Sequence, residues 1–159
     1  MILVTGGNCQ GKKAFSQSVL MDLPQGGSGV WCDGSCADWE TFMKERYGWN
    51  FHLFVRRVML GEAGALPGRT GSSIFRASRE KGHVWTEKEL ADLASLLVQS
   101  LADEGAGRIL VTDEIGCGIV PVEYFERIYR EETGRICCLA ASRASQVWRV
   151  CCGIGQRIK

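Results

Sequence analysis

The sequence lacks the features of a membrane, secreted or nucleic-acid-binding protein. No apolar stretch approaches the roughly 20 residues that cross a bilayer, and the first residues carry neither a basic leader nor a small-residue cleavage site. The formal net charge is only +1, so no general excess of basic residues is present to grip nucleic acid. We therefore expect a cytoplasmic protein with no membrane span and no nucleic-acid partner. A single site for a small anion stays possible.

The composition is that of one folded domain. The 159 residues are 45% hydrophobic and 23% charged, which argues against disorder. This length fits a single domain over residues 1–159 and leaves little room for a second.

Cysteine is abundant, with 8 residues in the chain. In a reducing cytoplasm we expect free thiols that act as small buried apolar side chains. A structural zinc ion or a redox pair is the alternative, because Cys32 and Cys36 have a loose version of zinc-ligand spacing. The adjacent pairs 137–138 and 151–152 point to different faces of their elements, and Cys9 and Cys117 complete the set.

Short β-rich runs alternate with helical patterns along the chain. Strands are expected at 2–4, 30–32, 108–112 and 147–152, with a short one at 154–158. Helices are expected at 14–21, at 37–60 with Gly48 as its breaking point, from 86 onward, at 121–132 and at 136–145. Alternation of this kind predicts an α/β fold in three layers, with a mostly parallel sheet covered on both faces.

Two segments of this pattern have particular features. Thr86 and Glu89 have the spacing of a capping box at the start of a helix. Residues 61–82 are rich in glycine, serine and basic residues, so we expect a flexible loop or lid that extends to about residue 85. In the expected helix over 37–60, Trp49 is one of the apolar positions.

A glycine-rich segment follows the first strand and precedes the first helix. It matches the pattern G-x-x-x-x-G-K through Gly6, Gly7, Asn8, Cys9, Gln10, Gly11 and Lys12. In such a loop the backbone N–H groups curl round a phosphate, the helix adds its positive end, and the lysine reaches the β- and γ-phosphates. The segment predicts nucleotide binding, and the structural alternative is a turn that only joins strand to helix.

Lys13 departs from this pattern, which has a serine or threonine after the lysine to ligate Mg²⁺. An ammonium group cannot ligate a metal ion. Three interpretations remain: another group holds the metal, Lys13 replaces part of its charge, or phosphoryl transfer is impaired. Asp33 and Asp113 each follow a strand and are the candidate magnesium carboxylates. Since ligands bind where parallel strands end, Asp33 and Gly34 are also expected in the nucleotide site.

Four motifs carry a family resemblance. They are MILVTGG at 1–7, VTDEIGCGIVP at 111–121, YREETGR at 129–135 and the ending over 147–159 with its CGIG at 152–155. Together they closely resemble the bifunctional adenosylcobinamide kinase/adenosylcobinamide-phosphate guanylyltransferase family of cobalamin assembly. The match is strong over residues 1–13 and 108–159 and weak between them.

The resemblance implies a P-loop NTPase-like fold, a homotrimer and two reactions. The first phosphorylates the aminopropanol hydroxyl of adenosylcobinamide, and the second transfers GMP from GTP onto that phosphate, so ATP or GTP are substrates with Mg²⁺. The family accepts GMP on a histidine that lies in a helix after the second strand.

Only two histidines are available for that role. His52 has the right order in the chain, and Arg56, one helical turn further, could share the phosphate. A histidine beside Phe51 is otherwise a packing residue, and His83 is the rival acceptor. Glu62 is the acidic residue that soon follows this helix, and we assign it to the nucleotide site.

The middle of the chain supports the kinase reaction less well than GMP transfer. The longer members of the family carry an additional strand with an acidic residue between the histidine helix and the later strand, and 61–107 shows no β run for it. The main competing hypothesis is therefore a catalytically reduced, regulatory nucleotide-binding relative. A metal or thiol-redox protein is supported by the cysteine count alone.

Overall fold

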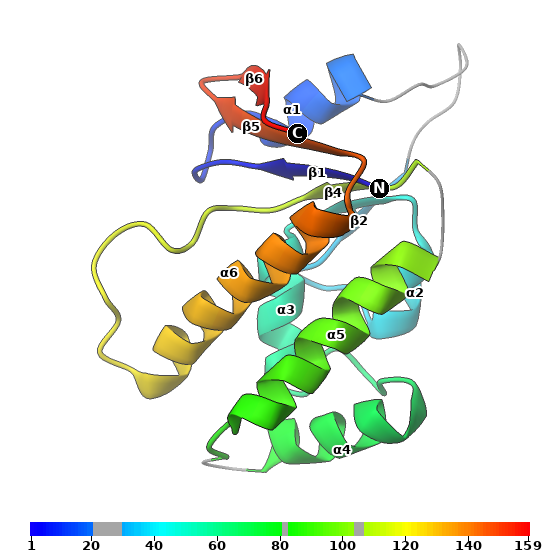
Figure 1. The fold of residues 1–159 in the computed structure, drawn as a ribbon, viewed down its shortest axis with the longest axis vertical. Helices are drawn as coiled ribbons and strands as arrows, with labels where there is room; N and C mark the ends of the chain where they lie inside the picture. The colour runs from blue at the N-terminus through cyan, green and yellow to red at the C-terminus, as the bar shows by residue number, and fades with distance from the viewer. Residues whose placement is uncertain (21–29, 81–82, 104–106) are drawn as a thin grey trace.

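The computed structural model describes residues 1–20, 30–80, 83–103 and 107–159. Six strands form one sheet in the order β2-β3-β4-β1-β5-β6 (Figure 1). Their bounds are β1 Ile2–Thr5, β2 Trp31–Asp33, β3 Tyr47–Trp49, β4 Ile109–Val111, β5 Gln146–Cys151 and β6 Ile154–Arg157. All neighbours are parallel except β6, which pairs antiparallel with β5. The predicted α/β fold with a mostly parallel sheet is confirmed.

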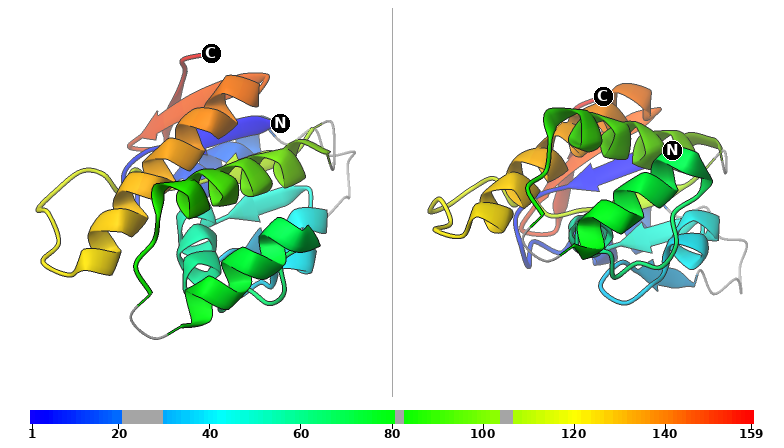
Figure 2. Two further views of the ribbon diagram at one scale, coloured as in Figure 1. Left: turned by 60° about the horizontal axis from the view of Figure 1, so that its bottom comes forward. Right: turned by 90° about the horizontal axis from the view of Figure 1, so that it is seen from below.

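Helices cover both faces of this sheet and make three layers. One face carries α1 (Lys12–Phe15) and the π-helical η1 (Ser16–Leu20). The other helices, with α5 and α6 side by side, pack on the opposite face (Figures 1 and 2). These are α2 Trp39–Lys44, α3 Phe51–Met59, α4 Gly68–Arg79, α5 Glu87–Asp103 and α6 Tyr124–Arg143.

The strand residues alternate between two hydrophobic cores. Leu3 and Leu110 point into the larger core beneath α3, α5 and α6. Val4 and Val111 point into the smaller core beneath α1. Because β1 and β4 are buried on both faces, their sequences read as unbroken apolar runs, and this is why both were found from sequence.

The helical pattern expected over 37–60 is interrupted at Gly48, as predicted, but the interruption is a strand that the sequence did not reveal. Two helices, α2 and α3, are separated by β3, and Gly48 is the central residue of that strand. A Cβ atom on Gly48 would lie 2.9 Å from the ring of Phe42, so the missing side chain lets that ring pack directly on the strand. A three-residue strand flanked by helical patterns leaves almost no periodicity to detect.

Two further expectations about helices need correction. Residues 68–79, expected within a flexible loop, form α4, which buries only Gly71 and Ile74 and therefore has little apolar signal. The two helices expected at 121–132 and 136–145 are one helix, α6, which runs through Gly134. The helix predicted at 14–21 is confirmed up to residue 20. The last residue of the prediction, residue 21, lies outside the described residues.

The start of α5 agrees with the sequence. Thr86 donates from both its N–H and its hydroxyl to Glu89 Oε2, at 2.9 and 2.7 Å, and forms the expected capping box. Between α3 and β4 the described residues contain helices and connections but no strand, as expected. Within the described ranges, no helix is both long and apolar enough to cross a bilayer.

Candidate functional site: a lysine–aspartate pair beside a glycine-rich loop

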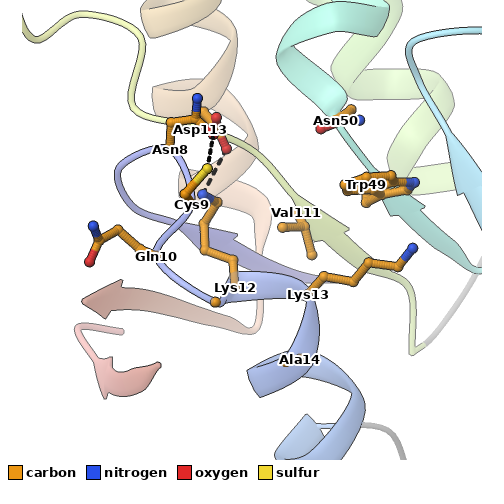
Figure 3. Close-up of a pocket in the computed structure, with 11 residues that line it drawn as sticks. Asn8, Cys9, Gln10, Lys12, Lys13, Ala14, Trp49, Asn50, Val111 and Asp113 are labelled. Atoms are coloured by element: carbon orange, nitrogen blue, oxygen red, sulfur yellow. Dashed lines mark hydrogen bonds and ion pairs between the residues drawn. The ribbon is translucent and has the colours of Figure 1, made fainter. Parts of the chain in front are cut away.

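Several strand ends and the glycine-rich loop meet around one cavity of about 210 Å³ (Figure 3). Its walls come from the loop after β1, the first residues of α1, and the ends of β3 and β4. The lining residues are Asn8, Cys9, Gln10, Gly11, Lys12, Lys13, Ala14, Trp49, Asn50, Val111 and Asp113. Of the three strand ends expected at one site, the glycine-rich loop and Asp113 line this cavity, whereas Asp33, Gly34 and Ser35 do not.

The loop is held in shape by the turn between β5 and β6. Gly6 has φ of 150°, and a Cβ atom there would lie 2.3 Å from the carbonyl oxygen of Val150, so no other residue fits this path. Gly11 has φ of 78° and lies against Gly153, whose N–H donates to the Gln10 carbonyl oxygen at 2.8 Å. The loop is thus a built feature of the fold.

Lys12 is buried, with its side chain only 6% exposed, and its ammonium group has two partners. It lies 2.7 Å from Asp113 Oδ1 and donates to the Gly7 carbonyl oxygen at 2.6 Å. β1 and β4 are adjacent parallel strands, so the residues that follow them are brought together. The pair fixes the Lys12 ammonium group in the lining of the cavity, with its charge balanced by Asp113.

Asp113 also connects this lysine to His52. The Asp113 N–H donates to His52 Nδ1 at 3.3 Å, and His52 Nε2 lies 3.9 Å from Asp113 Oδ2. Burial lowers the pKa of His52 below its ordinary value, with the Lys12 charge acting in the same direction and the Asp113 charge opposing it. The imidazole of His52 is therefore neutral and lies against Asp113. The Tyr129 hydroxyl fixes its backbone by donating to the His52 carbonyl oxygen at 2.9 Å.

The position of His52 differs from the one implied by the family resemblance. His52 lies on α3, which follows the third strand, whereas the helix after the second strand is α2. The sequence of α2, WETFMK, contains no histidine. His52 is 7% exposed and does not line the cavity. Because β3 was not recognised, the sequence placed His52 on the helix after the second strand, one helix too early, and its role as the GMP acceptor stays a prediction.

Lys13 extends in a different direction from Lys12 (Figure 3). Its Nζ lies 4.1 Å from the ring centroid of Trp49 and 6.0 Å from that of Trp31. Sequence analysis missed Trp49 as a site residue, because the unrecognised strand β3 left it inside an expected helix. The sequence signal that could have identified Trp49 is an aromatic residue at the carboxyl end of a strand.

Asp33 and Gly34 lie beside the cavity and do not line it. Asp33 Oδ1 accepts from the Ser35 N–H at 2.9 Å and from Asn50 Nδ2 at 3.0 Å. Burial opposes ionisation of Asp33, but these hydrogen bonds and the nearby Lys13 charge hold its pKa below the usual value. Gly34 has a packing role, since a Cβ atom there would lie 2.5 Å from the Asn50 carbonyl oxygen.

Two other predicted nucleotide-binding residues lie away from the cavity lining. Arg56 forms an ion pair with Glu126 of α6, with Nη2 and Oε1 2.6 Å apart. Glu62 is exposed and follows the far end of α3. Neither residue contacts the glycine-rich loop through any described hydrogen bond or ion pair.

The rival histidine, His83, lies in the connection before α5. His83 Nε2 is 3.3 Å from Glu89 Oε2, and its ring packs edge-on against Trp85. In Figure 1 this end of α5 lies at the opposite end of the molecule from α1.

The cysteines do not behave as the sequence suggested. Only Cys32 is buried, and six of the eight are exposed, so the expectation of small buried side chains is wrong for most of them. Burial raises the pKa of Cys32 to about 11, which makes its thiol unreactive. In the described part of the chain, no three or more histidine, cysteine and acidic side chains are grouped to hold a metal ion.

The donor set of the cavity does not fit the usual magnesium site of a P-loop. Lys13 occupies the position of the hydroxyl ligand, and the candidate carboxylate, Asp113, is already paired with Lys12. Asp33 accepts hydrogen bonds from its own turn and from Asn50.

Comparison with known proteins adds to this geometry. The model of the family "Cobinamide kinase / cobinamide phosphate guanyltransferase" matches residues 57–158, more than half of the chain. This range includes Asp113 and begins after Lys12 and His52. The "Bifunctional adenosylcobalamin biosynthesis protein CobU" of Salmonella typhimurium is 37% identical over 73 residues, 46% of this chain and 40% of that protein. The protein of the same name from Escherichia coli K12 is 45% identical over 51 residues, 32% of this chain and 28% of that protein. The matches therefore span less than half the length of these relatives.

Proposed function

The chain belongs to the cobinamide kinase / cobinamide phosphate guanyltransferase family, and from this premise we propose that it is a cytoplasmic nucleotide-dependent transferase of cobalamin assembly. It binds GTP or ATP in the cavity beside Lys12 and transfers a phosphoryl or GMP group to adenosylcobinamide or its phosphate. The observation that carries the proposal is the pairing of buried Lys12 with Asp113 beside the glycine-rich loop, at 2.7 Å.

Phosphate binding follows from the contacts of Lys12. Its ammonium group has three donors, of which Asp113 and the Gly7 carbonyl oxygen engage two. A phosphate oxygen entering the cavity takes the third donor or displaces Gly7. Because the ammonium group is already desolvated, a charge-assisted hydrogen bond to phosphate is stronger here than at an exposed lysine.

His52 is the GMP acceptor in this proposal, and its geometry defines what the step requires. Nδ1 accepts from the Asp113 N–H, so the proton of the neutral ring lies on Nε2. The lone pair of this tautomer lies on Nδ1, so the transfer requires the other tautomer, in which the contact with the Asp113 N–H is broken, the proton lies on Nδ1 and Nε2 carries the lone pair. Nε2 would then form a bond to the α-phosphorus of GTP, the bond from that phosphorus to the bridging oxygen would break, and pyrophosphate would leave with the electron pair. The Nδ1 proton would stay on the ring, and the imidazolium of the adduct would be stabilised by the Asp113 carboxylate, whose Oδ2 lies 3.9 Å from Nε2. The ring must also turn toward the cavity, because His52 does not line it.

One labelling experiment tests both binding and transfer. The protein is incubated with α-labelled GTP and magnesium, with and without adenosylcobinamide phosphate, and adducts are mapped by mass spectrometry. The proposal predicts an acid-labile, base-stable adduct that disappears in His52→Ala and persists in the matched variant His83→Ala. An adduct that persists in His52→Ala would refute the acceptor role. Bound GTP without adduct or product would refute the transferase.

The second candidate function is a nucleotide-binding relative that does not transfer GMP. Two observations favour it: Lys13 replaces the hydroxyl residue, and α2 carries no histidine. This candidate predicts measurable GTP or ATP affinity with no adenosylcobinamide product from either nucleotide. A product assay with each nucleotide therefore separates the two functions.

The remaining sequence-based contacts have different support. Asp33 and Gly34 adjoin Asn50, which lines the cavity, so they are proposed to shape the nucleotide site. Arg56 would have to leave Glu126 to reach a phosphate. Glu62 follows α3 and would have to move toward the cavity to contact a nucleotide.

A further inference from the structure

We propose that Lys13 is a built-in cation that takes over the charge of the magnesium ion, so that this cavity binds a nucleoside triphosphate without needing Mg²⁺. The inference rests on the proposed function, because it concerns the same cavity. It is carried by the place of the Lys13 ammonium group, which lies over the Trp49 ring at 4.1 Å and lines the cavity beside Lys12.

The cavity disfavours a divalent cation. A hydroxyl at position 13 would offer an oxygen ligand, but an ammonium group offers none and repels a second cation. Within the described part of the chain, the one carboxylate in the lining is that of Asp113, whose Oδ1 is already 2.7 Å from Lys12 Nζ. A magnesium ion would have to break this pair to gain that oxygen.

Lys13 is, by contrast, prepared to bind an anion. Among the described residues no carboxylate oxygen lies within ion-pair distance of its Nζ, and its closest described partners are the faces of Trp49 and Trp31. A cation–π contact is weaker than a charge-assisted hydrogen bond to phosphate, so the ammonium group can move from the indole to a phosphate oxygen. Trp49 thus holds the charge at the cavity until an anion arrives.

The charge balance of the lining agrees with this role. Among the described residues, the charged ones that line the cavity are Lys12, Lys13 and Asp113, so this lining carries one net positive charge, with the Asp33 carboxylate beside it and near Lys13. If Lys13 were a serine, Lys12 and Asp113 would cancel, and the polyphosphate would need an external cation. The Lys13 ammonium group therefore neutralises phosphate charge that a bound metal ion would otherwise neutralise.

Calorimetry of ATP and GTP binding, in magnesium and in EDTA, tests this inference. For the native protein we expect dissociation constants that differ by less than about threefold between the two conditions. Lys13→Ser is expected to lose about tenfold in affinity in EDTA and to recover most of it with magnesium. Lys13→Arg keeps the charge and should behave as the native protein does. Lys88→Ser, at an exposed position on α5, is the matched control and should change nothing.

The outcomes separate this inference from the proposed function. Native binding that weakens tenfold or more in EDTA would overturn the inference and leave nucleotide binding intact. Equal affinities of Lys13→Ser and the native protein in EDTA would also overturn it. Failure of the native protein to bind either nucleotide in both conditions would refute the proposed function and the inference together. Circular dichroism of each variant verifies that it is folded.

Discussion

Replacing Asp113 with asparagine should lower stability and raise nucleotide affinity at the same time. The carboxylate balances the charge of Lys12, whose side chain is 6% exposed, while Asp113 itself is 18% exposed. Losing one partner of a buried ion pair costs about 3–5 kcal/mol. The partial exposure of Asp113, the remaining Gly7 acceptor and the amide oxygen of the new asparagine reduce this cost to about 2 kcal/mol. For a chain of this length, that corresponds to a fall in Tm of roughly 4–8 °C.

Nucleotide affinity should move in the opposite direction. Asp113 repels the phosphates and competes with them for Lys12, so its neutralisation should tighten magnesium-free binding by on the order of fivefold, or about 1 kcal/mol. Urea unfolding gives the stability change, and calorimetry in EDTA gives the affinity. Asp92→Asn is the matched control, because its pair with Lys88 is at a similar distance, 2.9 Å, but is exposed. That variant should lose less than about 0.5 kcal/mol.

The reasoning would be refuted if Asp113→Asn left stability unchanged, because Lys12 would then not depend on this carboxylate. It would also be refuted if stability fell and nucleotide affinity fell with it in a variant that remains folded. In that case Asp113 would be a contact for the nucleotide and not a competitor.

Three further predictions concern pH, the loop and assembly. Burial raises the pKa of Glu132 from 4.5 to about 7. The protonated carboxyl group of Glu132 therefore contributes to stability below pH 4.5, and this contribution is lost as the pH rises through 7. At pH 8, Glu132→Gln should be more stable than the native protein by roughly 3 kcal/mol in urea unfolding. An equal pH dependence in both proteins would contradict this. Gly6→Ala should cost roughly 2 kcal/mol or more because of the contact with Val150, whereas Gly134→Ala, in the open on α6, should stabilise by up to about 1 kcal/mol; equal thermal shifts would argue against the tight loop. The family resemblance predicts a homotrimer, and a monomer mass in light scattering at micromolar protein would count against it.

The parts of the fold that sequence predicted well are those where burial leaves a strong pattern. β1 and β4 are buried on both faces and read as apolar runs, and α5 is marked by its capping box and a leucine face. The order of Lys12 and Asp113 after adjacent parallel strands made their meeting predictable. The convergence of the loop and Asp113 was therefore accessible from sequence, and the binding of a nucleotide there stays a prediction.

The parts that sequence missed have weak local signals and depend on tertiary contacts. β3 has three residues, and only its pairing with β2 and β4 makes Gly48 a strand residue. Missing β3 had two consequences for the site: Trp49 was not recognised as the partner of Lys13, and His52 was assigned to the helix after the second strand. α4 was missed because only Gly71 and Ile74 are fully buried in it and Phe75 is partly buried against the core, so its apolar face is short.

The central claim is that the cavity beside Lys12 holds nucleotide phosphates, and titration calorimetry of GTP with the native protein and Lys12→Ala tests it most directly. Loss of a charge-assisted contact in a desolvated site should cost about 2 kcal/mol or more, which is at least roughly a thirtyfold rise in Kd. Lys88→Ala, which removes an exposed lysine, should bind GTP as the native protein does. A folded Lys12→Ala variant with unchanged GTP affinity would contradict the assignment of this cavity to nucleotide binding.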